Sequence, residues 1–185
     1  DIASGSLDLE QALIADGVKV EDLYPIDVPR ALNSFKRIRP HIRKFWDTGA
    51  LSAQMLTDQE AVMGSIWNTR LQAAVDSGAP LGIEWNGGML NMQSWSIAAN
   101  SRNIENAQRF VEFAVAPERQ AALCALIPNG PTNKRSFEHI APDRAAILPS
   151  NPEFAAVQFH QNVEWWADNR SAVAEAWSKW LLENR

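Results

Sequence analysis

The sequence predicts an α/β protein, and two observations support this fold class. Helical periodicities alternate with short apolar runs as far as about Ala98, and mostly helices follow. The run from Val62 to Ile66 has no clean alternation of polar and apolar residues, which is typical of a strand covered on both faces of a parallel sheet. Helices and strands that alternate in this way form an open sheet with helices packed against it.

Two helices are expected near the start of the chain. The first runs from Leu7 to Ala15 and is closed by Asp16-Gly17. The second begins after Asp27, a favoured N-cap, because apolar residues recur after it at helical spacing. These residues are Val28, Ala31, Leu32, Phe35 and Ile38. Pro40 is expected to end this helix.

Short strands and helices are expected to alternate over the next part of the chain. The predicted strands cover residues 42–46, 62–66 and 82–85, and residues 94–98 form an alternating extended segment. The predicted helices between them cover residues 53–57, capped by Ser52, and residues 69–75.

The rest of the chain is expected to be mainly helical. Asn103 caps a helix with a regular apolar stripe, formed by Ile104, Ala107, Phe110, Val111 and Ala114. Pro117 opens a further helix that reaches Leu126, because proline is tolerated in a first helical turn. Residues 128–133 form a rigid loop, short helices follow to about residue 161, and the last helix covers residues 171–182.

Composition excludes several classes of partner. The net charge of −5 argues against nucleic acid and anionic membranes, both of which require a basic face. No run of apolar residues is long enough to span a bilayer. Cys124 is the single cysteine and permits no internal disulfide. The three histidines lie far apart in the sequence, so no metal site is predicted.

Side chains that hold a ligand are expected where the buried strands end. Trp67 and Asn68 follow the 62–66 strand, and open α/β sheets bind ligands outside the carboxyl ends of their strands. An indole provides the best face for a cation, but Trp67 as a core residue and Asn68 as a helix cap are the alternatives. Thr48 and Gly49 precede a helix whose first backbone amides could hold a carboxylate or phosphate, with a plain turn as the alternative.

Several tracts in a consistent order resemble the polyamine (spermidine/putrescine) binding family of periplasmic solute-binding proteins of ABC importers. They are Ile66-Trp67-Asn68, residues 88–100 with Asn91-Met92-Gln93-Ser94, residues 128–133, and Asn162-Val163-Glu164-Trp165-Trp166. Each tract is short, but together they cover nearly the whole chain.

The resemblance implies the fold of type II periplasmic binding proteins, in incomplete form. Residues 1–92 would be part of the second α/β lobe, and residues 93–185 the hinge crossing and the helical C-terminal part of the first lobe. The parent protein would be secreted to the periplasm, with its signal peptide outside this chain. It would capture a small solute between its lobes, close about a hinge and dock on a membrane permease, without catalysis, a cofactor or insertion into the membrane.

The resemblance also implies the ligand residues, which are Trp67, Asn68, Asn91, Gln93 and Trp166. Trp166 could equally be buried beside Trp165, and the helix start at Thr48 adds a further candidate. The polyamine binders carry an aromatic residue and a carboxylate where this chain has Asn91 and Gln93, and an amide where it has Trp166. A neutral Gln93 loses one ion pair to an ammonium group. The family's acidic positions near Ser4 and Leu7 are also neutral here. A smaller amine or a neutral or zwitterionic solute therefore fits as well as a polyamine.

Two alternatives remain. The tract Asp47-Thr48-Gly49-Ala50 resembles the catalytic loop of aspartic proteases, whose chemistry requires two such aspartates that share a proton. The residues after it predict a helix and not the β-rich barrel of those enzymes. The other alternative is a fragment of the binding protein that has no activity.

Overall fold

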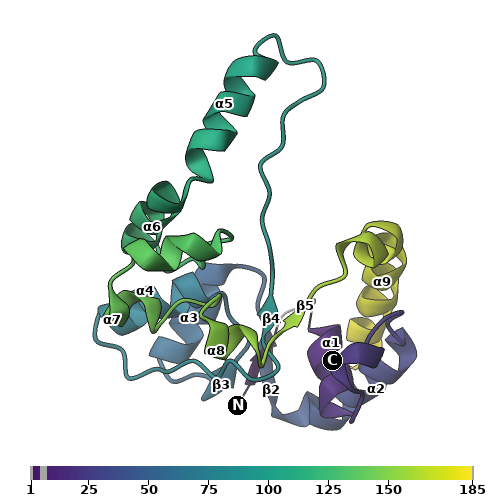
Figure 1. The fold of residues 1–185 in the computed structure, drawn as a ribbon. Coiled ribbons are helices and arrows are strands. Elements are labelled where there is room, and N and C mark those ends of the chain that lie inside the picture. The colour runs from purple at the N-terminus through teal and green to yellow at the C-terminus, as the bar shows by residue number, and fades with distance from the viewer. Residues whose placement is uncertain (1, 5–7, 185) are drawn as a thin grey trace. The chain divides into compact units, whose positions relative to one another are not determined.

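The computed structural model describes residues 2–4 and 8–184, and for residues 2–4 the backbone alone. The described chain forms two compact units, one of residues 1–88 with 161–185 and one of residues 89–160 (Figure 1). We call them unit 1 and unit 2. The division of the chain into lobes at residues 92 and 93 concerns the whole protein and stays a prediction.

Unit 1 is a three-stranded parallel sheet with helices on it. Its strands are β1 (Ile2–Ser4), β2 (Ile42–Phe45) and β3 (Met63–Gly64), in the order β2-β1-β3. Its helices are α1 (Leu9–Ala15), α2 (Val28–Ile38), α3 (Gly49–Thr57), α4 (Asn68–Asp76) and α9 (Val163–Glu183), with short 3-10 turns η1 (Val20–Asp22) and η2 (Arg39–His41). Ile2 of the central strand pairs with Ile42 on one side and with Met63 on the other. The predicted α/β class with a parallel sheet is therefore confirmed.

Local signals account for most of these helices. Asp27 caps α2 by accepting a hydrogen bond from the backbone amide of Arg30 at 3.0 Å. Asp16, which ends α1, accepts hydrogen bonds of 2.5 Å from the guanidinium groups of Arg30 and Arg37 on α2. These two guanidinium groups hold the pKa of the Asp16 carboxyl below its usual range.

Four aromatic rings form one part of the core of unit 1. Phe35 of α2, Phe45 of β2, and Trp177 and Trp180 of α9 pack with ring centroids 5.0 to 6.3 Å apart. Such pairs contribute beyond the area that they bury. The second part of the core is aliphatic and consists of Met55, Leu56, Ala61 and Leu71, with Trp46, Leu51, Ile66, Val75, Leu81 and Ile83 packed against it.

Four expectations for unit 1 are wrong. Helix α3 begins at Gly49 and its cap is Thr48, whose hydroxyl accepts from the amide of Leu51 at 3.3 Å, while Ser52 is buried inside the helix. The strand at Val62 is not covered on both faces, because Val62 is 84% and Met63 66% exposed. Residues 82–85 form no strand. Helix α9 starts at Val163 and not near residue 171, because Asn162 caps it by accepting from the amide of Trp165 at 2.9 Å.

Unit 2 contains a two-stranded sheet and several helices. Strands β4 (Met89–Leu90) and β5 (Phe159–His160) are parallel, with Met89 paired to Phe159. The helices are α5 (Ile104–Ala114), α6 (Pro117–Leu126), α7 (Pro142–Ala145) and α8 (Pro152–Ala155), with the 3-10 helix η3 (Lys134–His139). The predicted helices at residues 104 and 117 are thus confirmed.

The predicted loop at residues 128–133 is confirmed and is fixed by side chains of helix α6. Gln120 donates to the Thr132 hydroxyl and accepts from the amide of Asn133, both at 2.9 Å. The Cys124 thiol donates to the Asn129 carbonyl at 3.0 Å. Burial raises the pKa of this thiol.

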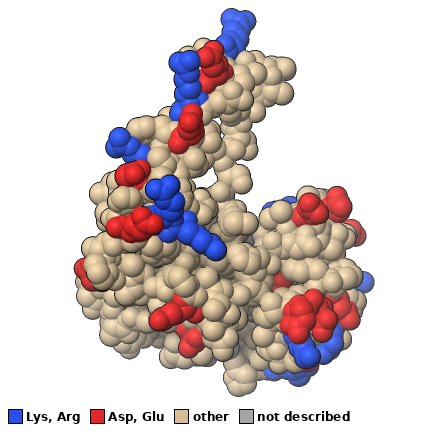
Figure 2. Space-filling view, in the orientation of Figure 1, with Lys and Arg blue, Asp and Glu red and all other residues tan. Residues whose placement is uncertain are grey.

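Acidic and basic side chains are interspersed on the face shown in Figure 2. This distribution agrees with the modest net charge of −5. Among the described residues no helix is long and apolar enough to cross a membrane.

Candidate ligand-binding site

The carboxyl ends of the three parallel strands of unit 1 meet at one edge of the sheet. Strand β2 leads into Trp46 to Thr48, and strand β3 leads into Ser65 to Asn68. The Ser65 hydroxyl, directly after β3, donates a hydrogen bond of 2.6 Å to Asp8, which immediately precedes α1. Open α/β sheets bind their ligands at this edge.

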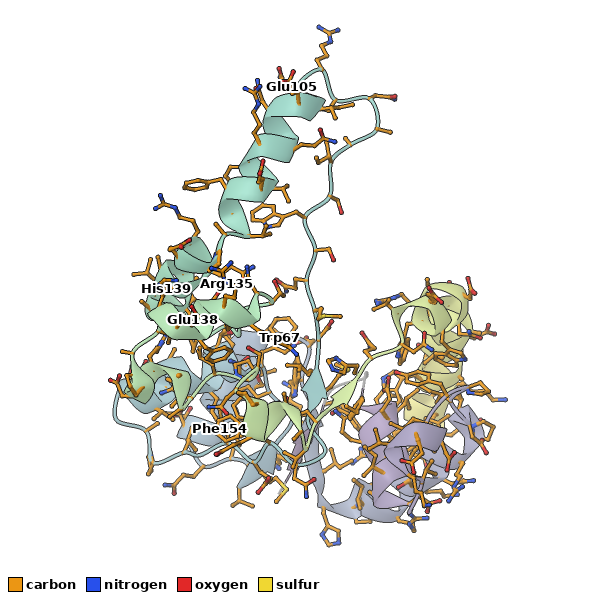
Figure 3. All side chains as sticks on the ribbon, viewed as in Figure 1. Trp67, Glu105, Arg135, Glu138, His139 and Phe154 are labelled. Atoms are coloured by element: carbon orange, nitrogen blue, oxygen red, sulfur yellow. The ribbon has the colours of Figure 1, made fainter. Side chains whose placement is uncertain are left out.

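An aromatic pair covers part of this edge. The rings of Trp46 and Trp67 meet edge to face, with centroids 6.1 Å apart and planes at 80°. Trp67, which is labelled in Figure 3, is 62% exposed and is therefore not a core residue of unit 1. The Trp46 indole N–H is buried and has no hydrogen-bond partner. The pair therefore offers a flat apolar surface to a ligand with methylene groups.

Arg70 lies beside this pair and was not predicted as a site residue. A Cβ atom on Gly49 would lie 3.3 Å from Arg70 Cγ, 3.4 Å from Arg70 Nε and 3.4 Å from Trp67 Cε3. The Arg70 side chain therefore runs along the backbone at the start of α3. Its guanidinium is exposed and makes no hydrogen bond or ion pair with any described residue. A free guanidinium can bind a carboxylate through two parallel hydrogen bonds.

Thr48 and Asn68 stand at the starts of the two helices that follow the strands. The Thr48 hydroxyl is the cap of α3, and the first free amides of that helix belong to Gly49 and Ala50. Asn68 is the first residue of α4, while the N-cap position is held by Trp67, whose side chain makes no capping hydrogen bond. Asn68 is half-buried.

Asn91 and Gln93 belong to unit 2. They lie just after β4 on an extended segment, and both side chains are exposed. Leu7 lies outside the described residues, and so does the side chain of Ser4. The neutral replacements that the sequence indicates at these two positions are therefore not tested.

Trp166 is in the interior of unit 1, where it is 3% exposed. Its indole N–H donates to Glu10 Oε1 at 2.7 Å, and its ring meets that of Trp165 edge to face at 5.3 Å. The Tyr24 hydroxyl donates to the same Glu10 oxygen at 2.5 Å. Glu10 is fully buried, and its second oxygen has no partner. We call Glu10, Tyr24 and Trp166 the Glu10 network.

The Glu10 network can be monitored through the titration of the Tyr24 hydroxyl. Burial, with the hydrogen bond to Glu10, raises the pKa of Tyr24 to about 12. Tyr24 is the only tyrosine of the sequence, so the tyrosinate absorbance reports on this residue alone. We expect the titration midpoint near 12, and a lower midpoint in Glu10→Ala. Because the unfolded chain loses this proton near pH 10, the folded state should lose stability as the pH rises from about 10 toward 12. A midpoint near 10 in the folded chain would contradict the network.

A concave region of unit 1 lies away from this edge of the sheet. A groove of about 470 Å³ lies between α2 and α9 and is lined mainly by apolar side chains, among them Ile26, Leu32, Trp165 and Trp180. Neither Trp67 nor Arg70 lines it. A position at the carboxyl edge of the sheet, together with accessible polar groups, is a better guide to the ligand site than the volume of a groove is.

Comparison with known protein families decides what kind of protein this geometry belongs to. Residues 3–156 match the family model described as bacterial extracellular solute-binding protein. The chain belongs to this family. Its members bind solutes and are not enzymes, which confirms the sequence prediction on both points.

Individual members of the solute-binding family agree with this assignment. A γ-aminobutyric acid-binding protein of Pseudomonas aeruginosa is 31% identical over 177 residues, which are 93% of this chain and 50% of that protein. A spermidine/putrescine-binding periplasmic protein of Escherichia coli is 25% identical over 146 residues, 78% of this chain and 40% of that protein. The crystal structure of an ABC transporter substrate-binding protein from Bradyrhizobium japonicum matches with a TM-score of 0.85 and 37% identity, over 97% of this chain and 57% of that one.

These matches confirm the resemblance and the fold. The polyamine binders are among the relatives, and the solved neighbours are solute-binding proteins with the predicted architecture. The chain spans about half the length of the relatives that it matches.

The geometry also removes support for the aspartic-protease alternative. Asp47 is exposed in the turn between β2 and α3. A second tripeptide of the required type, Asp76-Ser77-Gly78, is present in the sequence, but it ends helix α4. There Asp76 accepts a hydrogen bond from Gln72 at 2.8 Å, a pairing one helical turn apart. One aspartate thus lies in a turn and the other at a helix end, and the chain belongs to a family of solute-binding proteins.

Proposed function

We propose that the protein containing these residues is the substrate-binding component of an ABC importer. It captures a small polar solute in the cleft between two lobes, in the periplasm, and delivers the solute to a membrane permease. Unit 1 supplies one wall, formed by Trp67 with Trp46 behind it, Asn68, and the helix start at Thr48. Asn91 and Gln93 supply the hinge side, while Trp166 is held in the interior of unit 1 by its hydrogen bond to Glu10.

The observation that carries this proposal is the exposed Trp67 beside the free Arg70 at the carboxyl edge of the sheet. Although Trp67 meets Trp46 and the Arg70 stem lies beside Gly49, most of the Trp67 side chain and the Arg70 guanidinium remain accessible to a solute. Together they suit a solute with a short aliphatic body and an acidic group.

The same observation favours one solute class over another. A polyamine carries only positive groups, and Arg70 would repel them. A carboxylate is attracted, and the exposed Asp47 beside Trp46 could hold an ammonium group on the same solute. An amino acid with separated charges therefore fits this wall better than spermidine or putrescine. The γ-aminobutyric acid named for the Pseudomonas aeruginosa relative is a molecule of this kind.

The test is a titration of this chain followed by nuclear magnetic resonance of the indole N–H groups. We expect γ-aminobutyrate to move the signals of Trp46 and Trp67, and putrescine to leave them in place. Arg70→Gln should weaken binding by roughly tenfold or more, because a charged hydrogen-bonded pair is lost. The matched control is Arg170→Gln, an exposed arginine of α9, which should bind as the unchanged chain does.

Two results would overturn the proposal. If putrescine and not γ-aminobutyrate moves the Trp67 signal, the solute class is wrong. If none of the tested amines, amino acids and small organic acids moves it, the wall itself is wrong.

A further inference from the structure

The link between strand β3 and helix α4 carries Trp67, the exposed indole of the candidate wall. It consists of Ser65, Ile66 and Trp67 and has no regular secondary structure. Ile66 packs against the aliphatic core, whereas the Trp67 side chain is mostly exposed and makes no capping hydrogen bond to α4. The orientation of Trp67 therefore depends on how the backbone of this link is held, as well as on the edge-to-face contact with Trp46.

Asp8 holds this link from another element of unit 1. It stands at the N-cap position of α1, where an aspartate ordinarily accepts a hydrogen bond from a backbone amide of the first helical turn. Its carboxylate makes no such capping bond, and Asp8 Oδ2 accepts the Ser65 hydroxyl at 2.6 Å instead. Hydrogen bonds to a charged acceptor are shorter and stronger than neutral ones. A favoured capping residue whose carboxylate binds a link 57 residues away breaks a local rule, and such breaks are expected at functional sites.

Helix α1 is a firm support for this hydrogen bond. Leu9 is fully buried, and Glu10 accepts two hydrogen bonds within the Glu10 network. At the other end of the helix, Asp16 binds the guanidinium groups of Arg30 and Arg37 on α2. The first turn of α1 can therefore hold the link after β3 in one place.

We propose that Asp8 is a positioning residue of the solute site, which acts on Trp67 through Ser65. The hydrogen bond fixes the end of β3, and the end of β3 sets the direction in which the indole faces the solute. A site loses affinity when the support of a contact side chain is loosened, because binding must then order that side chain. The inference rests on the proposed function, since it concerns the wall that Trp67 forms there.

The first test needs no solute and follows the indole N–H signals of this chain by nuclear magnetic resonance. Asp8→Ala removes the acceptor, and we expect the Trp67 signal to shift and broaden although the two residues are far apart in the sequence. The signals of Trp166 and Trp177, which are buried elsewhere in unit 1, should stay in place. Asp8→Asn keeps an acceptor oxygen for Ser65 and should restore most of the Trp67 signal. A Trp67 signal unchanged by Asp8→Ala would overturn the proposal.

The second test measures the Kd of γ-aminobutyrate in a double-mutant cycle. Asp8→Ala and Ser65→Ala should each weaken binding roughly fivefold, and the double variant should bind no more weakly than either one, because all three lack the same hydrogen bond. Asp8→Asn should restore most of the affinity. Ser77→Ala is the matched control, since the Ser77 hydroxyl donates to the Ala73 carbonyl at 2.9 Å at the far end of α4. This variant should bind as the unchanged chain does.

Three binding results would also overturn the proposal. Additive losses in the double variant would give the two side chains separate roles. An equal loss in Ser77→Ala would show that affinity follows the stability of unit 1 and not the position of Trp67. Asp8→Asn binding as weakly as Asp8→Ala would show that the charge of Asp8 acts on the solute directly. If the unchanged chain binds no γ-aminobutyrate, the proposed solute class is wrong, and the Trp67 signal in Asp8→Ala still decides the role of Asp8.

Discussion

Glu10→Ala lowers the free energy of unfolding by roughly 3 kcal/mol, the largest effect that we expect from a single side chain of unit 1. Glu10 is fully buried and accepts hydrogen bonds from Tyr24 at 2.5 Å and from the Trp166 indole at 2.7 Å. Alanine leaves both donors buried without an acceptor and opens a cavity. Urea unfolding followed by near-ultraviolet circular dichroism measures the change.

Two further variants test whether the loss of the hydrogen-bond acceptor at Glu10 causes the fall in stability. Glu10→Gln keeps an oxygen for both donors and should cost clearly less than alanine. Glu175→Ala, on the exposed side of α9, should stay within about 0.5 kcal/mol of the unchanged chain. Equal losses for alanine and glutamine at position 10 would show that the charge of Glu10, and neither its volume nor the presence of an acceptor oxygen, stabilises this region.

Gly130→Ala is expected to destabilise unit 2 by roughly 2 to 3 kcal/mol, because the added methyl group overpacks the loop. A Cβ atom at this position would lie 2.3 Å from Ser150 Oγ, 2.6 Å from Ser150 Cβ and 2.8 Å from the Ser150 backbone nitrogen. The Ser150 hydroxyl donates to the Pro131 carbonyl at 3.1 Å, so the displacement also breaks this hydrogen bond. Limited proteolysis of the 128–133 loop, or its amide exchange, measures the loss.

Gly82→Ala is the matched control for this prediction, since a Cβ atom there meets nothing within 4 Å. It should leave stability nearly unchanged. Ser150→Gly removes the two closest atoms and should restore part of the stability of Gly130→Ala, with the backbone clash left in place. A Gly130→Ala chain as stable as the Gly82→Ala chain would contradict the close approach.

Helices with a cap and a periodic apolar face were predictable from the sequence. Asp27 before α2 and Pro117 at the start of α6 marked those helices correctly. The first turns of α9 were missed, because Glu164, Asp168 and Arg170 interrupt any apolar period there. The signal that could have found them was Asn162, which lies three residues before the amide that it caps.

Strands were harder to predict, because a strand needs a neighbour that the local sequence does not contain. Residues 81–85 alternate between half-buried and exposed, as their sequence indicates, and Leu81 and Ile83 pack on the aliphatic core. No strand pairs with them among the described residues, so no ladder forms. The pattern predicted which side chains point inward and could not predict hydrogen bonding.

The residues of the candidate site were likewise only partly predictable from the sequence. Trp67 and Asn68 were found because they follow a strand, whereas Trp46 was read as part of one. Arg70 could have been found as the residue one helical turn after Trp67 on α4. Burial of Trp166 beside Trp165 was one of the two interpretations that the sequence allowed, but its hydrogen bond to Glu10 could not be predicted, because Glu10 is 156 residues away in the chain.

Residues that pack together in the core of unit 1 are far apart in the sequence, and this affects how the core forms during synthesis. Phe35 and Phe45 are synthesised before unit 2, whereas Trp177 and Trp180, which cover them, are synthesised only after it. While unit 2 is being synthesised, the nascent chain carries an open aromatic surface, the condition under which chaperones bind and aggregation begins. The aromatic part of the core of unit 1 can therefore close only once residues 161–184 have been made.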